Sequence, residues 1–435
     1  MPTRSRIALA LALLLAGAFP ASADVLEEKA IAFREALMLR HFAPEGVVLY
    51  TVKLDSIERD LEQGTYPDLA DTPTFTGMFA AASCLRAELV RGEERREAVS
   101  DADRAVAGLE LLTQVTGRPG LMARGVRRVR TPQPKEGDKR WFPGAPGFEQ
   151  FRWRGDVSMD QYAHGLIPAI WECRKLFPER TRRLAVDFAT RLVEDDMRLV
   201  DPDGRPTRYG DLSWRSGFGL NSIAQLTGYA AFALAAALDP DGPWLAERER
   251  IVNRERVPAR SRITNLRVLA TTNHSNDLMA WNLYRALVPL AREVGDPALA
   301  DLRHGMHRAW LRVREDGNAY FALLLCRIEP ESCDPEAVAA ARDQLVRFPL
   351  EKRALGSNPK AAELPRRWLR GRKWEPLARD PVPIELRPAS SLEWKSSPYR
   401  LERDARPNRK YTGVDYLAAY WLLRALEPVE EARAR

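Results

Sequence analysis

The sequence predicts an all-α protein folded as an (α/α)6 toroid, a ring of six helical hairpins. Segments with helical periodicity alternate along the chain, and no long stretch alternates as a strand would. Five hairpins follow one another, and the first and last helices, 25–42 and 412–426, have no sequential partner. If these two helices pack on each other, they form the sixth hairpin and close the ring. An open helical solenoid is the alternative.

The N-terminal segment has the pattern of a signal peptide. Arg4 and Arg6 precede an apolar stretch, 7–19, and Ala21-Ser22-Ala23 is a small-residue cleavage site. We therefore expect a signal peptide over 1–23, cleaved near Ala23, and a periplasmic or secreted protein. A single toroid domain is expected over 24–428, followed by a charged tail, 429–435. No later stretch approaches the ~20 uninterrupted apolar residues of a membrane span, so no membrane anchor is expected.

The overall charge is modest for a chain of this length. The formal net charge is +7, and the arginines are scattered rather than clustered. This distribution argues against a nucleic-acid partner and is compatible with an acidic ligand. The oligomeric state cannot be read from the sequence.

The first two hairpins have clear start and stop signals. Thr72 and Pro73 can open a helix that runs to about 91, and 96–116 is its return helix. The irregular segment 119–151 is long for a connection, which indicates a functional loop. Ser158 and Gln161 have capping-box spacing and begin a helix to about 177, followed by a return helix over 179–199.

The rest of the chain continues the alternation. Turns and extended chain are expected over 201–211, a short strand or extended lead-in over 46–54, and little periodicity over 350–409. The remaining helices are expected at 219–238, 244–256, 273–294, 297–314, 318–328 and 335–348.

The four cysteines divide into two pairs. Cys326 and Cys333 flank a short loop, and an exported protein can oxidise them, so we expect a disulfide there. Cys84 and Cys173 lie on apolar helix faces, where buried free thiols are expected and a bridge between the two helices is the alternative. Neither pair has metal-ligand spacing with histidine, so no metal or cofactor is expected.

Four segments resemble the secreted six-hairpin toroids, the glycosidase-like α/α barrels, over roughly 71–426. The segments are 71–77, 153–161, 273–277 and 412–416. This group includes hydrolases and lyases of polysaccharides, so the resemblance implies a poly- or oligosaccharide ligand, neutral or acidic. Asn273-His274 followed by Trp281 looks like the Asn-His segment of toroidal alginate lyases, which pair it with Arg and Tyr; Arg208-Tyr209 is the candidate here. The motifs match no one defined enzyme family.

Candidate catalytic groups gather at the predicted helix starts. In a toroid the inner helices are parallel, so their N-termini surround one mouth and their dipoles favour anionic and hydroxyl-rich groups there. An aspartate at a helix start also serves as a cap, which is the simpler role for each one singly. Asp156 is the first choice, because Ser158 already caps that helix. The catalytic candidates are Asp156, Asp160, His274, Asp277 and Asp415.

Polar and aromatic residues near the same starts are candidates for substrate binding. Aromatic rings stack on the apolar faces of sugars, and polar groups fix their orientation. His164 lies four residues after Asp160 and shares its helix face. The binding candidates are Asp71, Trp153, Gln161, Tyr162, His164, Arg208, Tyr209, Asn273 and Tyr411.

These residues predict a secreted carbohydrate-active enzyme, more readily a glycoside hydrolase than a lyase. Hydrolysis uses one protonated and one ionised carboxyl group, which the aspartates can provide. A lyase acting on an acidic glycan would use His274 or Tyr209 as base, with Asn273 and Arg208 neutralising the substrate carboxylate. A non-catalytic glycan-binding toroid is the third possibility.

Overall fold

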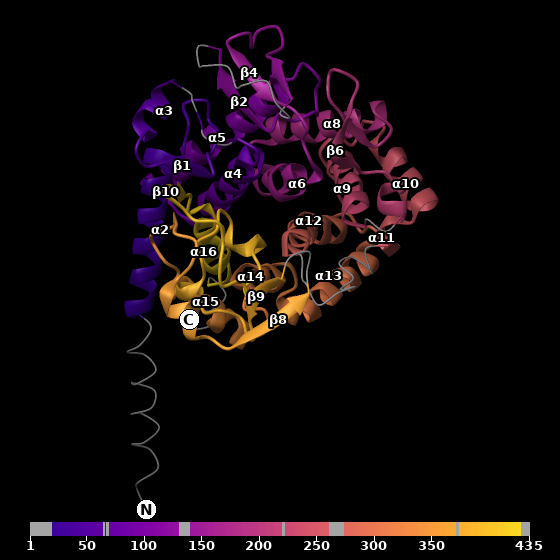
Figure 1. Ribbon diagram of the computed structural model, residues 1–435. Helices are drawn as coiled ribbons and strands as arrows, with labels where there is room; N and C mark the ends of the chain where they lie inside the picture. The colour runs from indigo at the N-terminus through magenta and orange to yellow at the C-terminus, as the bar shows by residue number, and fades with distance from the viewer. Residues whose placement is uncertain are drawn as a thin grey trace, which may run out of the picture.

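The computed structural model describes residues 20–63, 66, 69–129, 140–219, 222–260, 274–370 and 374–427, and it is mostly helical (Figure 1). Most of the expected signal peptide and the whole charged tail lie outside these residues. Within the described part, no helix has the length and apolar content that crossing a membrane requires.

Long helices in the described part contact one another in pairs, as the sequence predicts. The pairs are α4 (Thr72–Leu89) with α5 (Gly92–Gln114), α7 (Ile167–Cys173) with α8 (Pro178–Glu194), α9 (Ser222–Leu238) with α10 (Trp244–Glu255), α12 (His274–Glu293) with α13 (Leu299–Val313), α14 (Ala319–Ile328) with α15 (Pro335–Arg347), and α16 (Val414–Leu426) with α2 (Pro20–Arg40).

One helix of each pair also contacts its counterpart in the next pair. These central helices are α4, α7, α9, α12, α14 and α16, and α16 contacts α4 again (Figure 1). The predicted packing of the first helix on the last is confirmed: the Tyr416 hydroxyl donates to the Leu26 carbonyl over 2.9 Å. The rings of Phe33 and Tyr416 lie 4.8 Å apart. The two chain ends therefore share one apolar contact.

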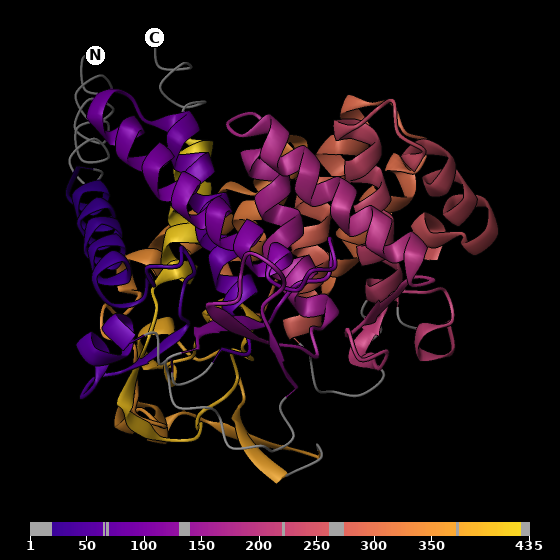
Figure 2. The same cartoon turned by 90° about the horizontal axis from the view of Figure 1, so that it is seen from above.

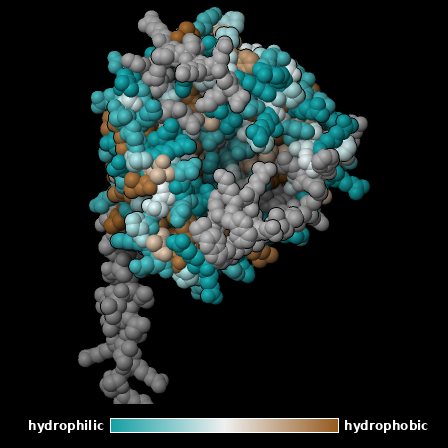
Figure 3. Space-filling view, viewed as in Figure 1, coloured by the Kyte–Doolittle hydropathy of each residue, from teal (hydrophilic) through white to brown (hydrophobic). Residues whose placement is uncertain are grey.

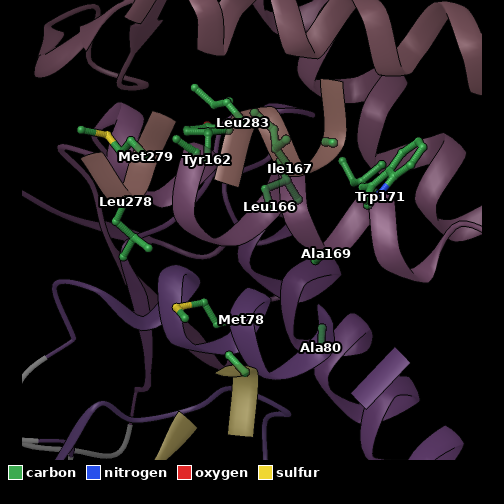
Figure 4. Close-up of a cluster of buried hydrophobic side chains, with 14 of the residues drawn as sticks. Met78, Ala80, Tyr162, Leu166, Ile167, Ala169, Trp171, Leu278, Met279 and Leu283 are labelled. Atoms are coloured by element: carbon green, nitrogen blue, oxygen red, sulfur yellow. The ribbon is translucent and has the colours of Figure 1, made fainter. Parts of the chain in front are cut away.

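The central helices bury a continuous apolar core that extends from α2 to α16. Figure 4 shows part of it, where Met78 of α4, Leu166 and Ile167 of the second hairpin, and Leu278 and Met279 of α12 lie close together. Small residues bring the backbones together. A Cβ atom on Gly77 would lie 2.3 Å from the Gly165 backbone. The close approach of α4 to the start of the second hairpin therefore requires glycine at this position.

The helix predicted over 158–177 is one continuous element with an irregular start. It begins as α6 (Met159–Gln161), passes through a π-helical turn, η1 (Tyr162–Leu166), and continues as α7. The shorter elements are α3 (Ile57–Gln63), α6 (Met159–Gln161), η1 (Tyr162–Leu166), η2 (Ser216–Gly219), α11 (Val257–Arg260), η4 (Pro330–Ser332), η5 (Pro359–Glu363), η6 (Ile384–Leu386) and η7 (Glu393–Lys395).

Small antiparallel sheets, which the sequence analysis largely missed, lie on one side of the helical layer (Figure 2). Their strands have two to six residues, too few for an alternating pattern to emerge. The sheet orders are β1 (Thr51–Lys53), β10 (Arg406–Tyr411), β7 (Arg353–Ala354); β2 (Gly125–Arg128), β4 (Phe151–Arg154), β3 (Trp141–Pro143); β5 (Arg198–Val200), β6 (Pro206–Asp211); and β8 (Arg366–Arg370), β9 (Trp374–Ala378).

Two disulfides cross-link the helices. Cys326 and Cys333 are joined, as predicted. The expectation that Cys84 and Cys173 are free thiols is wrong, because these residues bridge α4 and α7 across a separation of 89 residues. Their apolar helix faces pack on each other, which brings the two Cα atoms to 5.2 Å.

Candidate functional site

The site is built around the start of α6. The capping box predicted for Ser158 and Gln161 is present: the Ser158 N–H and hydroxyl both donate to Gln161 Oε1 over 2.8 Å. Because its oxygen faces Ser158, the Gln161 amide directs its Nε2 toward Asp71, 3.2 Å from Oδ1. One side chain thus caps α6 and connects it to the start of α4.

Asp71 stands just before α4 and does not cap it through its side chain. Its carboxylate instead faces two cations, with Lys395 Nζ at 3.4 Å and Arg124 Nη2 at 3.6 Å. The side chains of all three residues keep 17–26% of their surface exposed. The negative charge of Asp71 is therefore stabilised by neighbours while remaining accessible to solvent.

Asp160, in the first turn of α6, has the opposite environment. Burial raises the pKa of its carboxyl group, and the negative charge of Asp71 raises it further. Lys395 and Arg124 act against this shift without cancelling it. Two carboxyl groups at the starts of neighbouring helices are thus close enough to interact, and their surroundings favour protonation of Asp160.

The pair lies on the side of the molecule that carries the small sheets. Figure 3 shows this face, with a hollow near its middle whose floor is mostly hydrophilic; the hollow lies where Figure 1 places α6. The unpaired N–H groups at the start of a helix favour anionic and hydroxyl groups. The hollow therefore suits a polar ligand.

His164 lies in the π-helical turn that follows Gln161. It is 1% exposed, and neither ring nitrogen has a hydrogen-bond partner within the described structure. Burial lowers the pKa of its imidazole well below the usual value, and the charge of Lys395 acts in the same direction. A neutral imidazole four residues after Asp160 offers one donor and one acceptor.

Asp156, the first choice from the sequence, has a positional role in the structure. Its backbone is left-handed, with φ of 60°, and its N–H donates to both oxygens of Asp201 over 3.2 and 3.1 Å. Its Oδ1 accepts the Arg208 N–H over 2.8 Å and lies 3.9 Å from Arg140 Nη1. Asp156 therefore holds the β6 strand against the loop that enters α6.

Asp415, another catalytic candidate from the sequence, is completely buried, and its carboxylate forms an ion pair with Lys352. The same carboxylate accepts the Glu393 N–H over 2.8 Å, and its backbone carbonyl accepts Trp394 Nε1 over 2.7 Å. These bonds hold the turn η7, which places Lys395 beside Asp71. Asp415 thus fixes the turn that carries Lys395, and its own carboxylate does not reach the surface.

His274, the histidine predicted as a lyase base, forms a buried contact with another acidic residue, Asp316. His274, 2% exposed, has Nε2 2.9 Å from Asp316 Oδ2, and Asp316 Oδ1 accepts the Tyr399 hydroxyl over 2.8 Å. Asp277 is buried in the same first turn of α12, and Asn273 lies outside the described residues. The Arg208–Tyr209 pair lies on β6, with no described hydrogen bond or ring contact to His274.

Three of the predicted stacking residues have other neighbours. Trp153 is buried, and its Nε1 donates to the Pro143 carbonyl over 3.0 Å. The Tyr162 hydroxyl accepts the Met122 N–H and donates to the Gly120 carbonyl. Tyr411 lines a separate cavity of about 240 Å³ beside α2. Tyr209 alone among the predicted aromatics is mainly exposed, at 54%.

Sequence reasoning missed Arg124 and Lys395. Arg124 lies in the loop expected to be functional, but nothing in its local pattern marks it. Lys395 lies in the aperiodic segment 350–409, and it reaches Asp71 only through the tertiary fold. Among the described residues, no three or more His, Cys, Asp or Glu side chains gather as metal ligands would.

No protein-family model matches this chain, and no curated protein matches its sequence.

Proposed function

We propose that this protein is a secreted glycoside hydrolase with an (α/α)6 toroid fold over residues 24–428. The cyclic contacts of the six central helices support the toroid, and the continuous apolar core from α2 to α16 supports one domain. The two disulfides fit an oxidising compartment, as export after cleavage near Ala23 would provide.

The observation that carries the hydrolase proposal is the pair Asp71 and Asp160. Their environments differ: burial raises the pKa of the Asp160 carboxyl group, while Lys395 and Arg124 lie beside the Asp71 carboxylate. Two carboxyl groups whose environments shift their pKa values apart can serve as acid and base in glycoside hydrolysis.

In the proposed reaction Asp160 is the general acid. It gives its proton to the glycosidic oxygen, so the bond from that oxygen to the anomeric carbon breaks and the leaving sugar departs as an alcohol. Asp71 provides the negative charge on the other side of the bond, either by taking a proton from the attacking water or by adding to the anomeric carbon before water replaces it. The elements of one water molecule are added to the products in both cases.

The surrounding residues assist this chemistry. Gln161 fixes the Asp71 carboxylate through its 3.2 Å hydrogen bond, while Lys395 and Arg124 stabilise its charge. His164 is enclosed in the turn after Asp160, so its role in the proposal is to pack behind the carboxyl pair rather than to touch the sugar.

The test is a panel of neutral and acidic polysaccharides read in two ways. A hydrolase releases reducing ends without new ultraviolet absorbance, whereas a lyase also forms an unsaturated sugar that absorbs. Absorbance that depends on His274 would replace the hydrolase with elimination. Binding without either signal would indicate a non-catalytic glycan-binding protein.

A further inference from the structure

A second polar cavity lies beside the β5–β6 hairpin, outside the hollow over α6. Its volume is about 240 Å³, and its charged lining consists of Arg198, Arg215, Arg250 and Asp196. Three guanidinium groups against one carboxylate give the cavity a positive charge. It is somewhat smaller than the ~300–1,000 Å³ pockets of drug-sized ligands and suits a small ring with an anionic group.

Two of these arginines are available to a ligand. Arg198 and Arg215 are exposed, and within the described residues neither forms an ion pair with an acidic side chain. Arg250 does have such a partner, since its Nε lies 2.8 Å from Glu247 Oε2. Free guanidinium groups bind carboxylate and sulfate groups through two parallel hydrogen bonds.

The cavity wall is fixed by hydrogen bonds between two turns. The Leu212 N–H donates to the Met197 carbonyl over 2.9 Å, which ties the turn after α8 to the turn after β6. Asp196 and Met197 are both left-handed, with φ of 48° and 63°. The backbone carbonyl of Trp214 accepts Gln225 Nε2 over 3.2 Å, which anchors the second turn to α9. The arginines thus project from supported backbone.

Two exposed aromatic rings lie on β6 and on the turn that follows it. Trp214 is 43% exposed, with the Arg215 guanidinium carbon 5.0 Å from its ring centre. Tyr209 has the same relationship to Arg208, also at 5.0 Å. The β6 strand, which carries Tyr209, contacts α6, and Asp156 holds it there (Figure 1).

We propose that this cavity and the two arginine–aromatic pairs form a subsite for anionic sugar residues of an acidic polysaccharide. The arginines bind carboxylate or sulfate groups, and Trp214 and Tyr209 stack on sugar rings, so that the polymer continues along β6 to the hollow at α6. Because it names a glycan as the ligand, the subsite rests on the proposed function.

The test measures binding to the whole exported protein by calorimetry, with three probes of similar length: an oligouronate, a sulfated glucan fragment and a neutral gluco-oligosaccharide. The variant Arg198→Gln with Arg215→Gln should bind the acidic probe at least ~10-fold more weakly, and salt should affect its binding less. The oligouronate and the sulfated probe distinguish carboxylate from sulfate recognition. The neutral gluco-oligosaccharide should bind the double variant as tightly as it binds the unmodified protein.

The matched control is Arg95→Gln with Arg183→Gln, which removes two exposed arginines from the outer helices α5 and α8. It should bind as the unmodified protein does, and Arg198→Lys with Arg215→Lys should keep part of the affinity. Equal weakening in the control, or duplex DNA bound as tightly as the acidic glycan, would overturn the subsite.

Binding and cleavage fail separately in this design. An acidic probe that binds through Arg198 and Arg215, with no reducing ends released from any glycan of the panel, supports the subsite and contradicts the hydrolase. A neutral glycan that is cleaved, with no acidic probe responding to the arginine variant, contradicts the subsite and leaves the hydrolase in place.

Discussion

Glu172 of α7 and Arg285 of α12 form a buried ion pair, with 2.7 Å between Oε1 and Nε. The second oxygen of Glu172 lies 2.8 Å from Arg327 Nη2 on α14. Arg285 also donates to the Tyr320 hydroxyl over 3.0 Å. Three central helices are therefore joined by one buried polar network.

Replacing Glu172 by glutamine should lower the free energy of unfolding by about 3–5 kcal/mol, because Arg285 would remain buried without its counter-charge. Urea unfolding measures the change. Glu293→Gln is the control: its pair with Arg174 is 3.3 Å long and Glu293 is 60% exposed, so the loss should be at most about 1 kcal/mol.

The same pair should protect the protein against acid. Burial alone would raise the pKa of Glu172, but Arg285 and Arg327 outweigh it and lower the pKa to about 2. Its stabilisation is therefore present above the ordinary glutamate pKa and is lost as the pH falls toward 2. A Glu172→Gln variant with the same acid dependence as the unmodified protein would contradict this role.

Asp160→Asn should abolish most activity without destabilising the fold. A general acid contributes at least ~100-fold to the rate. Burial raises the pKa of Asp160, which means that its ionisation costs the folded protein stability. Asparagine carries no charge, so the variant should be as stable as the original or slightly more stable at neutral pH. Reducing-end release and thermal unfolding measure the two effects. Asp103→Asn, on the exposed face of α5, is the control.

The pH profile should reveal the same group. Activity should decline as the pH rises through the elevated pKa of Asp160, because the acid then loses its proton. A decline at the pH of an ordinary aspartate, or an unchanged profile in the asparagine variant, would assign the acid to another residue. Asp156→Asn provides that comparison, since Asp156 is the residue that sequence reasoning favours.

His41 should make the protein less stable in mild acid. Burial lowers the pKa of His41 to about 4, the charges of Lys410 and Lys352 act in the same direction, and the hydrogen bond to the Leu49 carbonyl opposes them. The unfolded chain takes up this proton near pH 6.5, so stability falls between about pH 6.5 and 4, by up to ~3 kcal/mol.

The His41→Asn variant isolates this effect, because its amide can still donate to Leu49. Denaturant unfolding at several pH values should show a shallower loss in the variant than in the unmodified protein. Parallel losses would mean that His41 does not titrate in this range.

The two disulfides should contribute different amounts to the free energy of unfolding. Loop-closure entropy gives about 4–5 kcal/mol for the bridge between Cys84 and Cys173, which are 89 residues apart, and about 2 kcal/mol for the bridge between Cys326 and Cys333, 7 apart. Paired alanine variants of each bridge, compared by thermal unfolding, measure this. A larger loss from the short loop would reject the entropic account.

The helix pairs could be predicted because their signals are local. Apolar periodicity marks each helix, Pro119 follows the end of the first hairpin, and Pro178 separates the two helices of the second. The strand expected within 46–54 is present as β1, but most strands could not be predicted, because their pairing is not local: Val126 of β2 pairs with Trp153 of β4, and nothing in either short segment specifies the other.

The candidate site was predictable in part for the same reason. Asp71, Asp160 and Gln161 each follow from helix-start patterns, and the fold brings them together because neighbouring central helices begin on one side. Lys395 is 324 residues from Asp71, so only the tertiary structure joins them. The buried pair of Lys352 and Asp415 likewise depends on how the aperiodic segment 350–409 covers the core.

The contact between α2 and α16 determines when folding can finish. The hydrogen bond from Tyr416 to Leu26 spans 390 residues, and the neighbouring rings of Phe33 and Tyr416 bury the same surface. Helix α16 is synthesised long after α2 and α4, so the apolar faces of both helices stay open to water throughout translation. A chain in this state exposes apolar surface that chaperones bind, and the contact between α2 and α16 forms only after the last helix has emerged.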